Sequence, residues 1–274
     1  MDPQFKPVMD AAYSGDFDLF KSLLKSDPSL ITQTSSDRGD SPNLIQFIVV
    51  EGGLVKIPNA EKFLLFLIEN GSTTERQLIA AASVNSRSLV DILLDAGVPL
   101  DEGAPWTALE ETLYWRHREL SEYLHAVRGA KLETLCGAAM MGNIDKLTSF
   151  FKDRKPIPEV APIYFPWGEI KGSTEQDAID QAFLLALRNN QYEAASCLLE
   201  CGAQINGIPP GNHEECTALH QAVSLNDIEM VDWLANRGAL PTIKDRRFSA
   251  DVFGWAEHQG KADILEHLNS RFAQ

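Results

Sequence analysis

The stretch that reveals the architecture of this chain is residues 217–239, which read TALHQAVSLNDIEMVDWLANRGA. Leu219, Ala222 and Val223 recur at the i, i+3, i+4 spacing of one helical face, so the first part predicts a short helix with a buried face. Thr217 stands at the expected N-cap, where its hydroxyl is able to accept a backbone N–H of the first turn. A helix is therefore expected to begin directly after this threonine.

The second part of the same stretch predicts a second helix that ends at a glycine. Ile228, Val231 and Leu234 form its apolar stripe. Gly238 follows where a left-handed residue closes a helix, a conformation that glycine adopts at the least cost. The stretch as a whole therefore predicts two short helices joined by a polar turn.

Weaker copies of this unit recur along the chain. Each has a first helix ending in small residues, a polar turn and a second helix with paired aliphatic residues; examples are Ala11-Ala12 with Leu23-Leu24, Ile79–Ala82 with Ile92–Leu94, and Ala182–Leu187 with Cys197–Leu199. Eight such pairs divide the 274 residues into units of about 34 residues, close to the period of several helical repeats. Solenoids of this kind usually bind other molecules.

The unit resembles the ankyrin repeat, in which about 33 residues carry Thr-Pro-Leu-His at the start of the first helix. Thr217-Ala218-Leu219-His220 differs from that motif only by alanine in place of proline, and Trp106-Thr107-Ala108-Leu109 is followed by Glu110 in place of histidine. The resemblance implies an all-α ankyrin-repeat solenoid of about eight helix-turn-helix units, one domain over residues 1–274 with a C-terminal capping repeat at about 248–274. It also implies that His220 is structural, with hydrogen bonds to the backbone of a neighbouring loop.

An insertion is expected after the fifth unit. Gly129 and Gly202 lie 73 residues apart, which leaves room for two repeats and a further segment. The excess falls in the proline-rich residues 152–174, whose three clustered aromatic residues are candidate partner contacts: Tyr164, Phe165 and Trp167. They either anchor a partner protein or fold back to cover the edge of the fifth repeat.

The ankyrin resemblance also implies a concave binding surface formed by first helices and extended links. The links favoured as contacts are Asp101–Trp106, Asn206–Cys216 and Thr242–Phe248. Trp106 is a candidate anchor there, with the alternative that it seals its hairpin. The candidate polar contacts are His213, Glu214 and Glu215.

Charge indicates the type of partner. The formal net charge of −15 argues against nucleic acid or an anionic membrane surface as the main ligand. Between Arg188 and Arg237 there is no lysine or arginine but seven acids: Glu193, Glu200, Glu214, Glu215, Asp227, Glu229 and Asp232. These acids either form a solvated, solubilising face or steer a partner protein with a basic surface.

Other kinds of chemistry find little support in the residues. The cysteines and histidines at 197, 201, 213, 216 and 220 include zinc-ligand types, but their spacing matches no compact zinc unit, so no metal is predicted. No phosphate-binding loop, nucleophile elbow or metalloprotease helix is present, so neither a cofactor nor enzyme activity is predicted. The absence of a long apolar run, a signal-peptide pattern and a disulfide framework predicts a cytoplasmic protein.

The sequence therefore predicts a non-catalytic protein–protein interaction module with a basic partner, bound through the concave face and the insertion. One alternative is a stoichiometric inhibitor or immunity-type protein that neutralises a basic toxin or nuclease. Another is an enzyme with an active site grafted on the solenoid, which would need a pocket where acids have raised pKa values. A third is an assembly role, in which the solenoid scaffolds a complex or pairs with itself.

Overall fold

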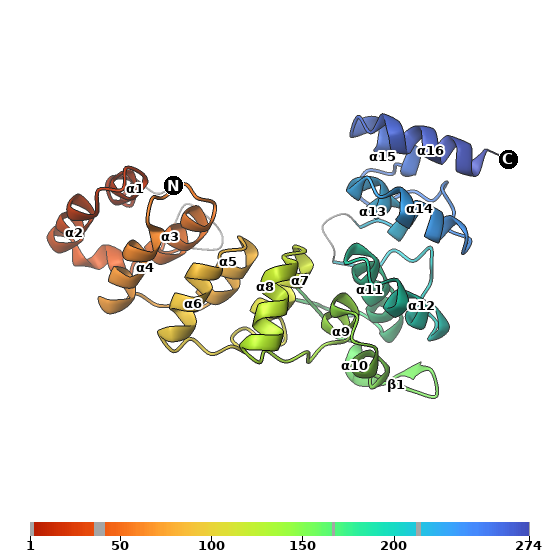
Figure 1. The fold of residues 1–274 in the computed structure, drawn as a ribbon, viewed down its shortest axis with the longest axis horizontal. Helices are drawn as coiled ribbons and strands as arrows, with labels where there is room; N and C mark the ends of the chain where they lie inside the picture. The colour runs from red at the N-terminus through yellow and green to blue at the C-terminus, as the bar shows by residue number, and fades with distance from the viewer. Residues whose placement is uncertain (1–2, 36–41, 166–167, 212–214, 274) are drawn as a thin grey trace. The chain divides into compact units, whose positions relative to one another are not determined.

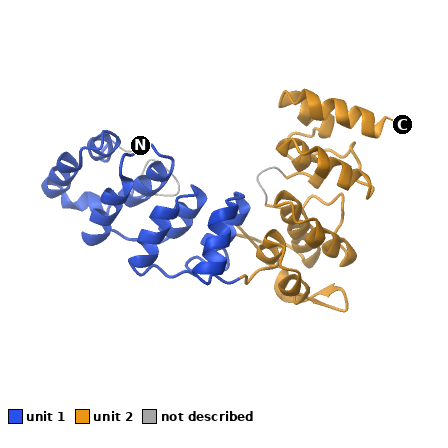
Figure 2. Ribbon diagram, viewed as in Figure 1, with its two compact units in different colours: residues 1–131 blue, residues 132–274 orange. Residues whose placement is uncertain are grey.

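The computed structural model describes residues 3–35, 42–165, 168–211 and 215–273. The chain falls into two compact units, residues 1–131 and residues 132–274 (Figure 2). Both are built mostly of short α-helices that follow one another in pairs, each pair folded back on itself (Figure 1). The prediction of a single repeat domain over residues 1–274 stays a prediction.

The N-terminal unit contains four helix pairs among its described residues. In chain order its helices are α1 (Lys6–Tyr13), α2 (Phe17–Ser26), the 3-10 helix η1 (Pro28–Ile31), α3 (Leu44–Gly53), α4 (Ala60–Glu69), α5 (Gln77–Ser83), α6 (Arg87–Asp95), α7 (Ala108–Tyr114), α8 (Arg118–Glu122) and the π-helix η2 (Tyr123–Val127). First helices contact first helices (α3 with α5, α5 with α7), and second helices contact second helices (α4 with α6).

Aromatic side chains join the first two pairs of this unit. The rings of Phe20 in α2 and Phe63 in α4 meet edge to face with centroids 4.8 Å apart, and Phe17 meets Phe63 in the same way at 5.2 Å. Phe20 and Phe63 are almost completely buried. Edge-to-face pairs of this kind contribute beyond the apolar area that they bury.

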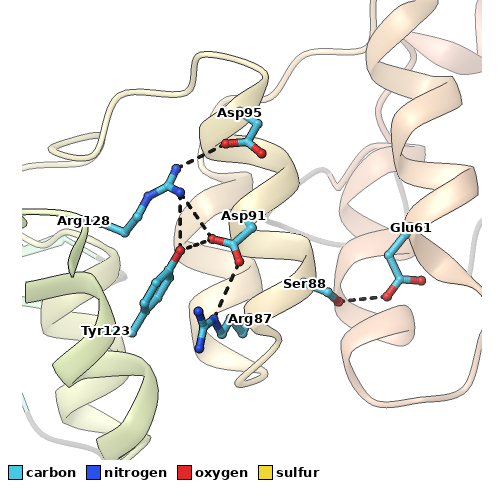
Figure 3. A network of polar contacts seen from close by, with 7 residues as sticks. All are labelled: Glu61, Arg87, Ser88, Asp91, Asp95, Tyr123 and Arg128. Carbon is cyan, nitrogen blue, oxygen red and sulfur yellow. Dashed lines mark hydrogen bonds and ion pairs between the residues drawn. The ribbon is translucent and has the colours of Figure 1, made fainter.

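Polar contacts join α6 to its neighbours on either side (Figure 3). The Tyr123 hydroxyl donates to Asp91, and Arg128 reaches Asp91 at 3.6 Å and Asp95 at 3.4 Å. On the other side of α6, the Ser88 hydroxyl donates to Glu61 of α4 at 2.8 Å. Several charged residues of this unit therefore link one second helix to the next.

The C-terminal unit also contains four helix pairs among its described residues, with two short hairpins after the first pair. Its elements are α9 (Leu135–Met141), α10 (Ile144–Thr148), β1 (Phe151–Lys152), β2 (Lys155–Pro156), the 3-10 helix η3 (Pro158–Val160), β3 (Ile163–Phe165), β4 (Gly168–Ile170), α11 (Glu175–Arg188), α12 (Tyr192–Glu200), α13 (Ala218–Leu225), α14 (Ile228–Ala235), α15 (Val252–His258) and α16 (Ala262–Phe272). The first helices α9, α11, α13 and α15 contact in succession, and α14 contacts α16.

The two hairpins correct the expectation of an all-α chain. β1 pairs antiparallel with β2, and β3 pairs antiparallel with β4 in the register Ile163↔Ile170 and Phe165↔Gly168. Prolines at 156, 158 and 162 lack the backbone N–H that a helix interior needs. The segment therefore forms strand pairs and a single 3-10 turn.

The helix pair at residues 217–239 matches its prediction with two exceptions. Leu219 is buried in α13, and Gly238 has the left-handed φ of 88° expected of a helix-closing glycine. The Thr217 hydroxyl does not cap α13, because it bonds instead to the ring of His220. Ile228 is 38% exposed at the start of α14, so the buried stripe of that helix excludes it.

Candidate functional site

His220 connects two successive helix pairs. Its Nε2–H donates to the Ala250 carbonyl in the loop before α15 at 3.1 Å, and the Thr217 hydroxyl donates to Nδ1 at 2.8 Å. The imidazole is completely buried and meets the Trp255 ring with centroids 5.1 Å apart. The role of this histidine is therefore structural, as the ankyrin resemblance implied.

The extended links of the C-terminal unit lie side by side. The side chain of Asn206 accepts from the Leu240 N–H at 2.9 Å, and the Arg246 N–H donates to the Glu215 carbonyl at 2.9 Å. Two of the three links favoured by the sequence, Asn206–Cys216 and Thr242–Phe248, are thus neighbours joined through their backbones.

Asp245 fixes the shape of the last link. The carboxylate, 3% exposed, accepts from the backbone N–H groups of Arg247, Phe248 and Ala250 and from the Trp255 indole at 2.5–3.0 Å. Burial raises the pKa of Asp245, but these hydrogen bonds outweigh burial and hold the pKa below its ordinary value of 3.8. A buried, ionised aspartate thus fastens the loop to α15.

Trp106 does not present its ring to solvent. The side chain is 5% exposed, and its Nε1–H donates to Glu111 Oε2 at 2.7 Å. The other carboxylate oxygen of Glu111 accepts from Trp115 Nε1–H at 2.7 Å. This placement agrees with the alternative that Trp106 seals its hairpin, while Trp115, 41% exposed, is the aromatic residue that reaches the surface beside it.

Glu111 is one of the buried carboxyls on first helices, with Glu110 beside it in α7 and Asp180 in α11. Burial raises the pKa of Glu111 above the ordinary value of 4.5, and the two indole hydrogen bonds only partly offset that rise. The i, i+4 spacing of Glu111 and Trp115 can be read from the sequence. The contact of Glu111 with Trp106 depends on how the link before α7 folds.

Three apolar side chains of the insertion are buried: Val160, Ile163 and Phe165. Phe165 is 2% and Ile163 is 2% exposed on β3, whereas Tyr164, between them, is half-buried. A Cβ at Gly211 would lie 3.1 Å from the Phe165 ring, so the hairpin packs against the link after α12. The burial of Phe165 agrees with the covering interpretation. Trp167 lies outside the described residues.

The candidate polar contacts fall at the edge of what the structure describes. His213 and Glu214 lie outside the described residues. Glu215 is half-buried with a positive φ of 43°, and its carbonyl accepts from the backbone of the next link.

Several acids of the stretch between Arg188 and Arg237 have structural roles. Asp227 caps α14 by accepting from the Met230 N–H at 2.9 Å. Asp232 accepts from His267 at 2.8 Å and lies 3.5 Å from the Arg271 guanidinium, and Glu200 lies 3.5 Å from that of Arg154. Cations distant in sequence therefore offset part of the local negative charge, which the sequence alone did not indicate.

Exposed acids also recur at one position of several second helices in the C-terminal unit. The second residue of α12, α14 and α16 is acidic in each case and exposed: Glu193, Glu229 and Asp263. An acid in the first turn interacts favourably with the positive end of the helix dipole. In these three second helices the repeat thus places one exposed carboxylate at the same point.

These features define a helical repeat protein, in which each short helix pair packs on its neighbours and the links between pairs lie side by side. A family model described as ankyrin repeats (3 copies) matches residues 135–245, from the start of α9 to the aspartate that fixes the last link. Residues 135–245 of this chain therefore contain ankyrin repeats.

One solved structure similar to this chain is the human ASB11 ankyrin repeat domain, with 18% sequence identity, 97% coverage of each chain and a TM-score of 0.40. No curated protein matches the chain. In the part of the chain that the structure describes, none of the helices combines the length and the apolar character needed to cross a membrane.

Proposed function

We propose that this protein is a non-catalytic binding module whose C-terminal unit receives a partner protein with a basic surface. Ankyrin repeats in general serve as protein-binding modules, and stacked repeats offer extended surfaces for that purpose. On this proposal the chain is a solenoid of about eight units, with residues 152–174 inserted after the fifth and residues 248–274 as the C-terminal cap.

The observation that carries the proposal is the recurrence of exposed acids on successive second helices. Glu193, Glu229 and Asp263 occupy equivalent positions and lie on the surface. Repeated carboxylates on a rigid scaffold favour encounter with a basic protein and reject acidic ones. Glu215 and Tyr164, both half-buried, remain candidate contacts on the neighbouring links and insertion, as do Trp167, His213 and Glu214.

The proposal is tested by capture experiments with the purified chain at low and high salt. A basic partner held by exposed carboxylates should be recovered at low salt and largely lost at high salt, because salt screens exposed charges beyond about a Debye length of 10 Å at 0.1 M. The charge-reversed variant Glu229→Lys should recover less of the partner.

The control variant is Glu69→Lys, which reverses an exposed acid on α4 of the N-terminal unit. It should retain the partner as the unmodified chain does. Recovery that is indifferent both to salt and to Glu229→Lys would overturn the proposal. An inhibitory role would show itself as a tight complex that abolishes an activity of the captured protein.

A further inference from the structure

The last link carries a compact positive patch on a protein that is otherwise acidic. Lys244, Arg246 and Arg247 place three bases within four residues, and all three are exposed. Beside them Phe248 is 63% exposed, with the Arg247 guanidinium 5.2 Å from its ring centroid. Cations next to an exposed aromatic ring are common in protein interfaces, where aromatic residues and arginine are enriched.

The backbone that carries these side chains is held in place by the protein itself. Asp245 accepts three backbone hydrogen bonds from the loop, and its bond from the Trp255 indole fastens the loop to α15. A surface whose backbone is ordered in advance loses less conformational entropy when a partner binds. The loop is thus suited to hold its exposed side chains ready for contact.

A groove adjoins the patch. Its volume is about 270 Å³, and its walls are mainly apolar: Phe248, Ala250, Gly254, Trp255, His258 and Gln259. The Phe248 and Trp255 rings meet at a steep angle, with centroids 6.3 Å apart. The groove is smaller than the roughly 300–1,000 Å³ of typical small-molecule sites, so a single large side chain of a partner fits it better than a whole cofactor.

We propose that this groove binds an acidic segment of a partner protein, with one large apolar side chain entering the groove against the rings of Phe248 and Trp255. Carboxylates that flank this side chain pair with Arg246 and Arg247 on the rim. The groove is a second site beside the carboxylates of α12, α14 and α16, and it shares no residue with them.

Charge complementarity selects this class of partner. Arginine binds a carboxylate with two parallel hydrogen bonds and stacks well on aromatic rings. Nucleic acid also attracts arginine, but a polyanion approaching this patch meets the field of a chain with a net charge of −15. A short acidic segment brings only a few charges, and its apolar side chain gains from burial in the groove.

The test uses three fluorescein-labelled peptides and the full chain. The first peptide is Glu-Asp-Glu-Phe-Glu-Asp-Glu, the second has alanine at its centre, and the third has lysine at every acidic position. Binding is followed by fluorescence anisotropy and by the shift of the Trp255 indole N–H resonance. The first peptide should bind and move that resonance, the second should bind roughly tenfold more weakly, and the third should not bind.

Two variants and a matched control locate the site. Arg246→Glu should weaken binding of the first peptide roughly tenfold or more, which corresponds to at least about 1.4 kcal/mol, and Phe248→Ala should weaken it to a similar degree. Lys152→Glu, a base-to-acid change on the exposed β1 strand, should leave binding unchanged. Circular dichroism of each variant should show the helical content of the unmodified chain.

Three results would overturn the proposal: equal binding of the lysine peptide, an effect of Lys152→Glu as large as that of Arg246→Glu, or stronger competition by an oligothymidine than by the acidic peptide. Light scattering that shows self-association abolished by Phe248→Ala would assign the groove to a second copy of the chain instead. None of these outcomes bears on Glu229→Lys, so the two proposals fail separately.

Discussion

Lys261, the N-cap residue of α16, donates its ammonium group to the carbonyl of Val223 at 2.9 Å and to the carbonyl of Ser224, in the last turn of α13. Carbonyl groups in the last turn of a helix lack the partner four residues further on, and that of Val223 otherwise accepts the Asn226 N–H at 3.0 Å. The residue that begins a second helix thus satisfies the end of a first helix in the preceding pair.

The same relationship recurs with different chemistry in other pairs. His117, the N-cap residue of α8, donates from Nε2 to the Ser83 carbonyl at the end of α5, at 2.9 Å. Gln191, the N-cap residue of α12, lies over Gly142, where an added Cβ would come within 2.2 Å of the glutamine side chain. In these three cases the N-cap residue of a second helix contacts the end of the first helix in the pair before it.

Lys261→Met should lower the free energy of unfolding of the C-terminal unit by about 1–2 kcal/mol, because two helix-terminal carbonyls lose a charged donor. Urea denaturation followed by circular dichroism measures this loss. Hydrogen exchange should speed up first at the end of α13. The matched control is Lys244→Met, an exposed link residue, for which a change below about 0.5 kcal/mol is expected. Equal losses in both variants would contradict the capping role.

Leu219→Ala should destabilise the C-terminal unit by about 2–5 kcal/mol, since it opens a cavity where a leucine with 1% exposure packs. Leu240→Ala is the control, because that leucine is 53% exposed and should lose less than about 0.5 kcal/mol. The shift of the denaturation midpoint, at an unchanged m-value, gives the loss of unfolding free energy for each of the two variants. A loss below about 1 kcal/mol for Leu219→Ala would mean that the helix face contributes no core.

Local features of the fold were predictable from the sequence. The burial of Leu219 follows from a helical period, and the left-handed Gly238 follows from its place after an apolar stripe. Thr217 failed as a capping residue because its hydroxyl has a nearby competitor in His220. The hairpins of the insertion and the Lys261 bridge depend on residues brought together from far along the chain, which no local pattern reports.

The candidate site was less predictable than the fold. The sequence favoured the links around Glu215 and Phe248, and the structure joins these links through the Arg246 N–H. It also favoured Trp106, which the Glu111 carboxylate holds inside. Whether a tryptophan contacts a partner protein or is buried in its own hairpin depends on which group accepts its indole N–H. For Trp106 this acceptor is Glu111, five residues further along the chain.

His220→Leu should cost about 1–3 kcal/mol, because it leaves the Thr217 hydroxyl and the Ala250 carbonyl without the ring atoms that they bond. Thr217→Val removes the hydroxyl alone. If the two residues act as a unit, the double variant should be destabilised by less than the sum of the single losses, with a coupling of about 0.5 kcal/mol or more. Thermal unfolding of the unmodified protein, the two single variants and the double variant gives the double-mutant cycle. Additive losses would show that the contact between Thr217 and His220 contributes nothing to stability.

The pH dependence of stability should reveal the buried Glu111. Its pKa in the folded protein lies above the ordinary value of 4.5, so the folded state binds the proton more tightly than the unfolded state does. This contribution is complete below pH 4.5 and is lost as the pH rises through the folded pKa. The stability of the unmodified protein relative to Glu111→Gln should therefore increase as the pH falls from neutral toward 4.5 and then level off. Urea titrations at several pH values measure it; a difference that does not vary with pH would show that burial does not raise this pKa.

Phe165→Ala and Tyr164→Ala should separate the two roles that the insertion could have. Phe165 is 2% exposed in β3, so its truncation should destabilise the C-terminal unit by about 3–5 kcal/mol and leave binding per folded molecule unchanged. Tyr164 is half-buried on the opposite face of the strand, so Tyr164→Ala should cost much less stability. If Tyr164 contacts the partner, its variant alone should weaken binding. Thermal melts combined with titration of the captured partner give both quantities. A Phe165→Ala protein that melts like the unmodified chain but binds poorly would assign the anchor to the phenylalanine and contradict its role as a cover.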